Sequence, residues 1–401
     1  MHSVRAARAL PHGLLRARVP GLASSAGLHG LAAGAACFAL ATTAAVQAGH
    51  VWGSETNPYL ATATAAFLAY LLGLILLCRG HTQLAAVLTV ATAIQLAPLA
   101  QPLLLSQDAG SYWDYGRIAA IHGGSPYQDP PNRYQADPAY PFVAAPWRDQ
   151  TSAYGPLFTL ISEGSAEVGG NAEDWSTWFY KTLGALSVLA AAAFAAALSP
   201  RPAFAAAAVG WNPLFAIHFG GGGHNDALMV ALLLGALVLE RRGRRQLSGG
   251  LWACAAAIKW IPLLLLPLWC ARPRSRFGYA GFVITAAGLA AIATAEYGTA
   301  WLSALGPIIH NAAQGSRASL VHLAAAGAVL FTLAYVVLFR KARHGTVRLG
   351  LTATALLVTT PWLLPWYAIW ALSLAAAEDD PVALTLSILV TGYMLIPALW
   401  I

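Results

Sequence analysis

The chain has 401 residues, of which 58% are hydrophobic and only 10% are charged. Soluble domains carry about 25% charged residues, so this composition excludes a soluble enzyme and predicts an integral membrane protein. The net charge of +7 does not indicate a nucleic-acid partner, because the basic residues stand in short clusters between apolar runs, the pattern that orients membrane helices.

Ten apolar runs follow one another along the chain. They lie near residues 28–48, 58–78, 83–105, 176–198, 203–219, 226–240, 277–296, 318–339, 350–375 and 381–401. A run of about 20 apolar residues crosses the hydrocarbon core of a bilayer, and we expect the first run to be retained rather than cleaved as a signal peptide. The sequence predicts a single all-α, polytopic membrane domain over residues 1–401, with about 10–12 transmembrane helices.

Clusters of arginine and lysine orient these runs. They precede the first run and follow the second, fourth, sixth and eighth runs, for example at Arg79, Arg201 and 241–245. Cytoplasmic loops are enriched in such residues. If these clusters are cytoplasmic, residues 106–175 form a large first outer loop on the periplasmic or extracellular side of the plasma membrane.

One segment, 250–270, breaks this alternation because basic residues flank it on both sides. Pro262 and Pro267 interrupt it, and Lys259 lies inside it. A helical hairpin that enters the membrane from the cytoplasmic side accounts for these features, since broken helices are tolerated at membrane depth inside protein. An ordinary span is the alternative.

The outer loop holds nine of the sixteen acidic residues: Asp108, Asp114, Asp129, Asp137, Asp149, Glu163, Glu167, Glu173 and Asp174. Within it, 109–122 is predicted to be a short amphipathic helix and 126–142 an extended, proline-rich connector. Residues 156–168 are too short and too polar for a span, so we place them in the outer loop or shallowly in the membrane.

Asp108 stands where an apolar run ends and this helix begins. One interpretation is a helix N-cap, although Ser106 is also placed to cap and would leave Asp108 free. With Tyr112 and Tyr115 on roughly the same face, the other interpretation is a general base that acts on a sugar hydroxyl.

Asp114 follows Asp108 after six residues. This spacing puts it about 120° further around the helix, so the two acids do not form a proton-sharing pair. We expect Asp114 to be solvated or salt-bridged, with Arg117 as the partner.

A glycine-rich stretch, HFGGGGHNDALM (218–229), leads through His224, Asn225 and Asp226 into an apolar run. It is either a glycine turn with an Asn/Asp cap or an exposed helix N-terminus that attracts an anion. His224 and Asp226 would then supply polar contacts or half of a metal site. A divalent metal is not indicated, because no known zinc-ligand spacing is present.

Two cations and an aromatic stretch complete the candidates. Lys259 lies in an apolar segment, and Arg317 lies in an outer loop. Each is either a headgroup anchor or a contact to the phosphate of a lipid-linked substrate. Trp366 and Tyr367, in PWLLPWYAIW, belong to an interfacial aromatic belt or stack on a sugar.

Four regions of the sequence together resemble a known family. They are SQDAGSYWDYGRIAAIHGGSPY (106–127), YGPL (154–157), WNPLFAIHFGGGGHNDALM (211–229), and the pair AIKWIPLLLLPL (257–268) and PWYAIW (365–370). In this order they resemble the polytopic GT-C glycosyltransferases, and within them the actinobacterial polyprenol-phosphate-mannose-dependent mannosyltransferases.

The resemblance implies a GT-C-like helical bundle and a mannosyl transfer, with inversion, from a polyprenyl-phosphate donor. The acceptor would be a hydroxyl of an envelope glycolipid or glycan at the outer face, without a cofactor. Asp108 occupies the position of the family's base. The substrate contacts would come from Tyr112, Tyr115, Tyr154, His224, Asn225, Asp226, Lys259, Arg317, Trp366 and Tyr367. The competing class is a lipid or solute transporter, which predicts ionisable residues along a path through several helices.

Overall fold

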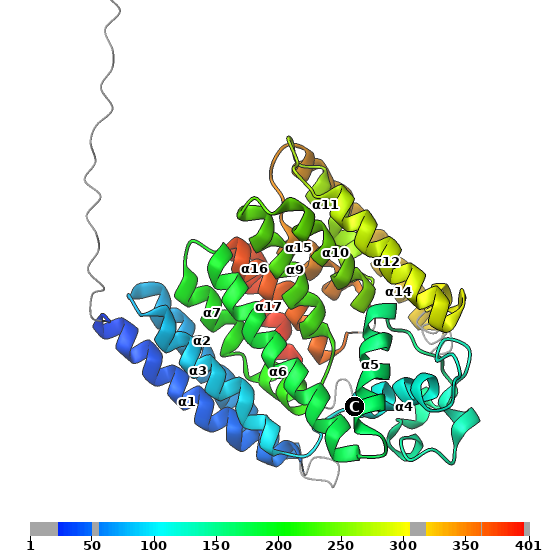
Figure 1. Cartoon of the computed structure of the whole chain (residues 1–401). Helices are drawn as coiled ribbons and strands as arrows, with labels where there is room; N and C mark the ends of the chain where they lie inside the picture. Colours follow the sequence, from blue (N-terminus) through cyan, green and yellow to red (C-terminus); the bar gives the residue numbers. More distant parts are fainter. Residues whose placement is uncertain (1–22, 50–55, 305–317, 362, 397–401) are drawn as a thin grey trace, which may run out of the picture.

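The computed structural model describes residues 23–49, 56–304, 318–361 and 363–396, and every regular element in these ranges is helical (Figure 1). Three helices form a layer along one side of the molecule: α1 (Ser25–Ala48), α2 (Thr56–Arg79) and α3 (Leu84–Leu96). Small residues let this layer approach the core closely. A Cβ added at Gly34 would lie 2.8 Å from the ring of Trp211, whose indole N–H donates to the carbonyl of Val87 (2.9 Å).

The centre of the bundle is built from buried helices on either side of the glycine-rich stretch. The chain runs through α6 (Glu173–Leu198), α7 (Pro202–Gly210), α8 (Pro213–Phe215), the π-helix η6 (Ala216–Gly221) and α9 (Asp226–Arg241). Near the C-terminal end of the chain, α15 (Leu349–Thr359), the 3₁₀ turn η8 (Pro365–Tyr367), α16 (Ala368–Glu378) and α17 (Pro381–Tyr393) complete the core. Ten of the eleven residues of α16 are buried, so α16 is enclosed by its neighbours.

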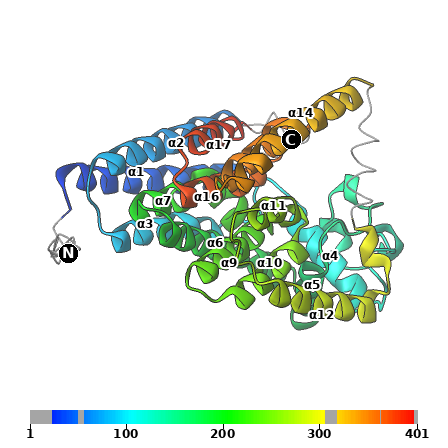
Figure 2. The same ribbon diagram turned by 90° about the horizontal axis from the view of Figure 1, so that it is seen from above.

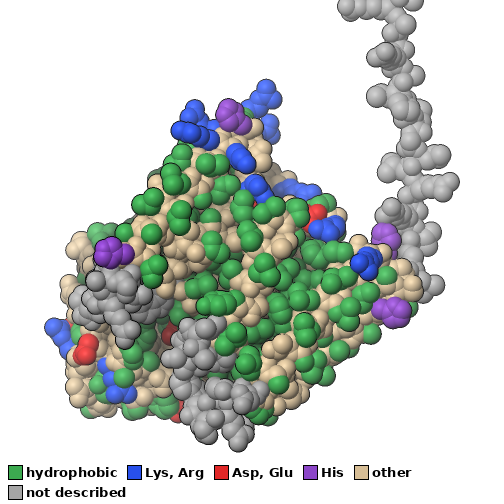
Figure 3. All heavy atoms as spheres, turned by 180° about the vertical axis from the view of Figure 1, so that it is seen from behind, with side chains coloured by type: hydrophobic (Ala, Val, Ile, Leu, Met, Phe, Trp, Pro, Cys, Tyr) green, Lys and Arg blue, Asp and Glu red, His purple; other side chains and the backbone are tan. Residues whose placement is uncertain are grey.

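The remaining long helices flank this core. They are α10 (Arg245–Ile258), α11 (Ile261–Cys270), α12 (Tyr279–Tyr297) with the 3₁₀ turn η7 (Ala300–Ser303), and α14 (Ala318–Arg343). Large apolar side chains of α12 and α14 are exposed, among them Ile284 at 72% and Leu333 at 61%. Hydrophobic side chains cover much of the face shown in Figure 3, and lysines and arginines gather at its upper end. Such a face matches lipid rather than water.

The predicted outer loop packs as one unit at the end of the molecule farthest from the N-terminal end of α1 (Figure 2). The 3₁₀ turn η2 (Ala97–Ala100) precedes it. It contains α4 (Asp108–Ala120), the 3₁₀ turns η3 (Pro131–Tyr134), η4 (Tyr140–Phe142) and η5 (Ala145–Trp147), and α5 (Pro156–Gly169). The helix expected at 109–122 is therefore present. The connector is a series of 3₁₀ turns rather than an extended segment, because its prolines favour the first positions of such turns.

The prediction of an all-α, multi-pass membrane protein is confirmed. Among the described residues, five helices are long and apolar enough to cross a membrane: α1, α2, α6, α12 and α14. The pair 202–210 and 213–221, bent by 43°, makes a sixth if it is one span. This count is lower than the predicted number of spans, because several apolar runs do not form one straight helix. Asn212 and Pro213, for example, interrupt the run 203–219, where the Asn212 side chain caps α8.

The segment 250–270 forms two helices, α10 and α11, separated by a break at Lys259, whose backbone is extended (φ −152°, ψ 141°). Pro262 stands at the start of α11, where a missing N–H is harmless. The entry of this pair into the membrane as a hairpin stays a prediction.

Candidate active site

Asp108 is the first residue of α4, and its carboxylate does not cap the helix. No side chain caps the helix, and the Asp108 backbone N–H donates instead to the hydroxyl of Ser106 (3.1 Å). The Asp108 side chain keeps 18% of its surface exposed, and its Oδ2 atom lies 3.2 Å from Nδ1 of His224. The Tyr112 hydroxyl approaches the same oxygen at 3.5 Å. The carboxylate therefore has polar partners and remains accessible.

The glycine-rich stretch brings His224 to Asp108 from 116 positions further along the chain. Gly221 lies so close to the segment before α4 that an added Cβ would stand 2.6 Å from the Leu104 side chain, and the Leu104 N–H donates to the Gly221 carbonyl (3.0 Å). Gly223 has a positive φ of 72°, which a residue with a side chain rarely adopts. The close approach at Gly221 and the positive φ at Gly223 both require glycine. The turn directs the His224 side chain toward α4.

The His224 ring is fully buried and stacks on Trp366, with the ring centroids 3.6 Å apart and the planes at 17°. Trp366 belongs to the turn η8, so the C-terminal part of the chain holds the imidazole in place. A ring fixed between an indole and a carboxylate has little rotational freedom, which orients Nδ1 toward Asp108.

Asp226 and Lys259 form an ion pair near the contact between Asp108 and His224. The Asp226 Oδ1 atom accepts from Lys259 Nζ (2.8 Å) and from the indole N–H of Trp370 (2.7 Å). The Lys259 ammonium also lies 4.8 Å from the ring centroid of Tyr367 and 5.4 Å from that of Trp370. Lys259 does not extend to lipid headgroups, because the break between α10 and α11 directs it inward, where aromatic faces and a carboxylate stabilise its charge.

A cluster of mostly buried aromatic rings packs beside Asp108. Tyr112 packs edge to face on Tyr154 (4.9 Å) and Phe158 (4.8 Å), and it also contacts Tyr180 (5.3 Å). A small recess at their edge is lined by Asp108, Ser111, Tyr115, Trp147, Ala153 and Tyr154. Among these rings, those of Trp147 and Tyr154 are partly exposed beside the carboxylate.

The pKa of Asp108 lies below its ordinary value. Burial would raise this pKa, but the hydrogen bond with His224, the electrostatic interactions with His224 and Lys259, and the hydrogen bond with Ser106 outweigh the effect of burial. The carboxylate is therefore ionised at neutral pH and accepts protons rather than donating them.

Asp114 corrects one expectation. It is only 1% exposed rather than solvated, and Arg117 does not pair with it. Arg117 donates instead to Asp137 (2.7 Å), because the turns η3 and η4 fold Asp137 back against α4. Burial and the negative charge of Asp137 raise the pKa of Asp114 to about 7, against the lowering effect of Arg117.

The structure thus brings together seven of the candidate side chains around Asp108 or Asp226: Tyr112, Tyr115, Tyr154, His224, Lys259, Trp366 and Tyr367. Asn225 is buried nearby, and its side-chain atoms have no hydrogen-bond partner among the described residues. Arg317 lies outside the described residues. Within these ranges, no three His, Cys, Asp or Glu side chains cluster closely enough to hold a metal ion.

Two contributors were not identified from the sequence. Trp370 donates to Asp226, and Tyr180 contacts Tyr112. Both lie in aromatic stretches whose composition also fits an interfacial belt. Only their position relative to other residues of the same helix separates a site residue from a belt residue. The four-residue spacing of Trp366 and Trp370 was the available signal, since it puts both indoles on one face of a helical turn.

Comparison with known proteins identifies the family of the chain. A family model described as "Alpha-(1->6)-mannopyranosyltransferase, N-terminal domain" matches residues 18–272, which include every described candidate except Trp366 and Tyr367. No solved structure matches the chain significantly.

Three curated relatives are also named alpha-(1->6)-mannopyranosyltransferases. The alpha-(1->6)-mannopyranosyltransferase A of Mycobacterium tuberculosis is 29% identical over 343 residues, which are 71% of this chain and 64% of the relative. The alpha-(1->6)-mannopyranosyltransferase B of Corynebacterium glutamicum is 24% identical over 67% of this chain and 55% of the relative, and the A protein of that organism is 28% identical over 46% and 38%. The chain spans less than two thirds of the length of these relatives. Since the family model covers more than half of it, the chain belongs to the alpha-(1->6)-mannopyranosyltransferase family.

Proposed function

We propose that the protein transfers a mannosyl residue from a polyprenyl-phosphate donor to a hydroxyl of an envelope glycolipid or glycan, at the outer face of the plasma membrane. The relatives' names support the sugar and an α-(1→6) linkage. The observation that carries the proposal is Asp108, an ionised and accessible carboxylate at the foot of an aromatic-lined recess, paired with a fixed His224.

The proposed reaction is one displacement with inversion. The acceptor oxygen attacks the anomeric carbon, the bond from that carbon to the phosphate oxygen breaks, and the polyprenyl phosphate leaves with the electron pair. Asp108 takes the acceptor proton as the new bond forms. The ionised Asp108 carboxylate can take this proton because the hydroxyl becomes more acidic as the glycosidic bond develops. His224 acts through Asp108 by keeping it ionised and oriented.

Lys259 is the candidate contact for the departing phosphate. Its ammonium group carries three N–H donors, of which Asp226 occupies one, so the others are available to phosphate oxygens. Tyr367 and Trp366, next to this pair and to His224, would cover the site from the side of η8. A cation beside the leaving group stabilises the charge that develops in the transition state. We further propose that the reaction needs no cofactor, since these side chains alone supply a base and a cation.

The test is Asp108→Asn in membranes supplied with polyprenyl-phosphate-mannose and an envelope glycolipid fraction. We expect transfer to fall by about 10²–10⁴-fold, the usual contribution of a positioned general base. Asp174→Asn is the matched control, because it makes the same chemical change at an exposed position at the start of α6. Undiminished transfer by a folded Asp108→Asn variant would refute the assignment. Movement of a solute across vesicles without a glycosidic product would instead favour a transporter.

A further inference from the structure

Two adjoining cavities lie far from the candidate active site, at the other end of α6. The first has a volume of about 380 Å³ and the second about 310 Å³, and Glu240, Arg241 and Arg272 line both. Helix α6 has 26 residues, so its ends stand about 39 Å apart at the helical rise of ~1.5 Å per residue. Glu173, at its start, lies beside α4, and Leu198, at its end, lines the first cavity.

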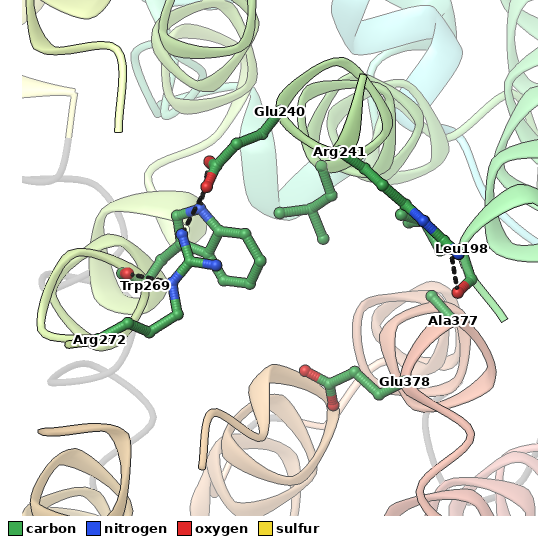
Figure 4. A pocket seen from close by; sticks show the side chains of 8 residues that line it. Leu198, Glu240, Arg241, Trp269, Arg272, Ala377 and Glu378 are labelled. Carbon is green, nitrogen blue, oxygen red and sulfur yellow. Dashed lines mark hydrogen bonds and ion pairs between the residues drawn. The ribbon is translucent and has the colours of Figure 1, made fainter. Parts of the chain in front are cut away.

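The first cavity combines an apolar wall with charged groups (Figure 4). Leu198, Leu237 and Ala377, at the C-terminal ends of α6, α9 and α16, form the wall. Figure 4 shows the Glu378 side chain directed into the cavity, opposite Glu240 and Arg241. Its carboxyl oxygens accept from the backbone N–H groups of Leu349 (2.6 Å) and Gly350 (3.0 Å), and burial raises its pKa to about 8 against the lowering effect of these hydrogen bonds.

The other carboxylate, Glu240, is fully partnered. Arg272 donates to its Oε1 atom (2.6 Å) and Trp269 to its Oε2 atom (2.7 Å), and the Arg272 guanidinium stacks 3.4 Å from the Trp269 ring centroid. This arrangement holds Arg272 rigidly at the boundary between the two cavities. It also neutralises Glu240, so the carboxylate does not repel an approaching anion.

The second cavity is strongly basic. Five arginines line it against the single carboxylate of Glu240, and the residues are Arg241, Arg245, Arg272, Arg274 and Arg276. After the pair of Glu240 with Arg272, the other four arginines have no carboxylate partner in the part of the chain that the structure describes. Ser275 lines the same space with a buried hydroxyl that lacks a hydrogen-bond partner there. Like charges that line one space repel one another, and an anion bound between them relieves this repulsion.

We propose that the two cavities form a binding site for a phosphate-bearing anion, with the phosphate held by the arginines of the second cavity and an apolar part lying along the wall of the first. Arginine presents a planar fork of N–H donors that matches phosphate oxygens, which a point charge does not. Two sources share this chemistry, an acidic phospholipid headgroup and a soluble phosphate, and the apolar wall favours the lipid. The inference does not depend on the proposed transfer reaction.

The experiment uses the purified full-length chain in detergent and a pair of variants. Arg274→Gln with Arg276→Gln removes two lining arginines, and Arg242→Gln with Arg244→Gln is the matched control. All four arginines are exposed at the same end of the molecule, but Arg242 and Arg244 line neither cavity. Both double variants lose the same charge, so general attraction to anions falls equally in both. Thermal unfolding of each variant without added lipid checks that the fold is intact.

Native mass spectrometry then follows the binding of dioleoyl-phosphatidylglycerol, with dioleoyl-phosphatidylcholine as the zwitterionic reference. We expect phosphatidylglycerol to bind more tightly, and its apparent Kd to rise about tenfold or more in Arg274→Gln/Arg276→Gln but less than about twofold in the control. Equal weakening in both variants would overturn the proposal, and no preference for phosphatidylglycerol would exclude the lipid headgroup as the ligand.

A second arm titrates inorganic phosphate and follows the thermal unfolding midpoint of the same three proteins. A shift that is lost only in Arg274→Gln/Arg276→Gln, together with no preference for phosphatidylglycerol, assigns the site to a soluble phosphate. A preference for phosphatidylglycerol that is lost in the same variant assigns it to the lipid. If neither probe distinguishes the two double variants, the cavities are not an anion site.

Discussion

The start and the middle of α4 hold two aspartates in opposite surroundings. Asp108, at the start, is partly exposed and interacts with His224 and Lys259, which lower its pKa. Asp114, in the middle, is buried without a hydrogen-bond partner among the described residues, and its pKa is raised to about 7. The difference teaches that the partners supplied by other helices, rather than the local sequence, decide which carboxylate is ready to accept a proton.

After Asp108→Asn, we expect the largest loss of transfer activity from Lys259→Met. The change removes the cation near Asp108 and leaves Asp226 with only the Trp370 donor, so transfer should fall about a hundredfold and stability by about 2–4 kcal/mol, less than for a fully buried pair. Thermal unfolding and initial rates measure the two losses.

A double variant separates the two roles of Lys259. Lys259→Met with Asp226→Asn removes the unpaired charge and keeps an acceptor for Trp370, so most of the lost stability should return while transfer remains low. Recovery of transfer in the double variant would show that Lys259 serves stability alone.

His224→Gln should have an intermediate effect, a loss of about tenfold at neutral pH from the missing charge-assisted contact. Because His224 helps to lower the pKa of Asp108, the variant should also move the acidic limb of the kcat/KM profile to higher pH. The pH–rate profile measures this shift. An unchanged limb with the same loss of rate would show that His224 only supports packing.

Asp114→Asn should leave transfer within about twofold and change stability instead. Because the pKa of Asp114 is higher in the folded state, the folded protein keeps this carboxyl group protonated at pH values where the unfolded chain has lost the proton. The free energy of unfolding therefore decreases as the pH rises from about 4 to about 7. Above pH 7, the ionised Asp114 lowers the free energy of unfolding by about 2–4 kcal/mol. The variant should therefore match the wild type near pH 4 and exceed it at pH 8 in thermal or chemical unfolding. A loss of transfer comparable to that of Asp108→Asn would contradict the contrast between the two acids.

The smallest effect is expected from metal removal. Treatment with EDTA should leave initial rates of transfer unchanged within error, because the proposed base and cation are side chains. Loss of activity that returns on addition of a divalent ion would show that a metal contributes to the site.

Much of the fold follows from local patterns. Apolar runs give the long helices α1, α2, α6, α12 and α14, since helical structure satisfies every backbone group in a lipid environment. The short helix at α4 and the position of Asp108 at its start were also predicted, because caps and turns depend on neighbouring residues. Among the described residues, fewer single long helices are present than predicted spans, since Asn212 and Pro365 interrupt apolar runs that hydrophobicity alone leaves continuous.

A membrane-embedded helical protein, and the residue types available for chemistry, follow from the amino-acid sequence because hydrophobicity and helix termini act over short distances. How these residues pair depends on the packing of distant segments: His224 with Asp108, Lys259 with Asp226, and Arg117 with Asp137 rather than Asp114. Asp108 and His224 lie 116 positions apart in the chain, and Asp226 and Lys259 lie 33 positions apart. Their formation depends on close helix packing, which glycines such as Gly221 permit and which no local pattern encodes.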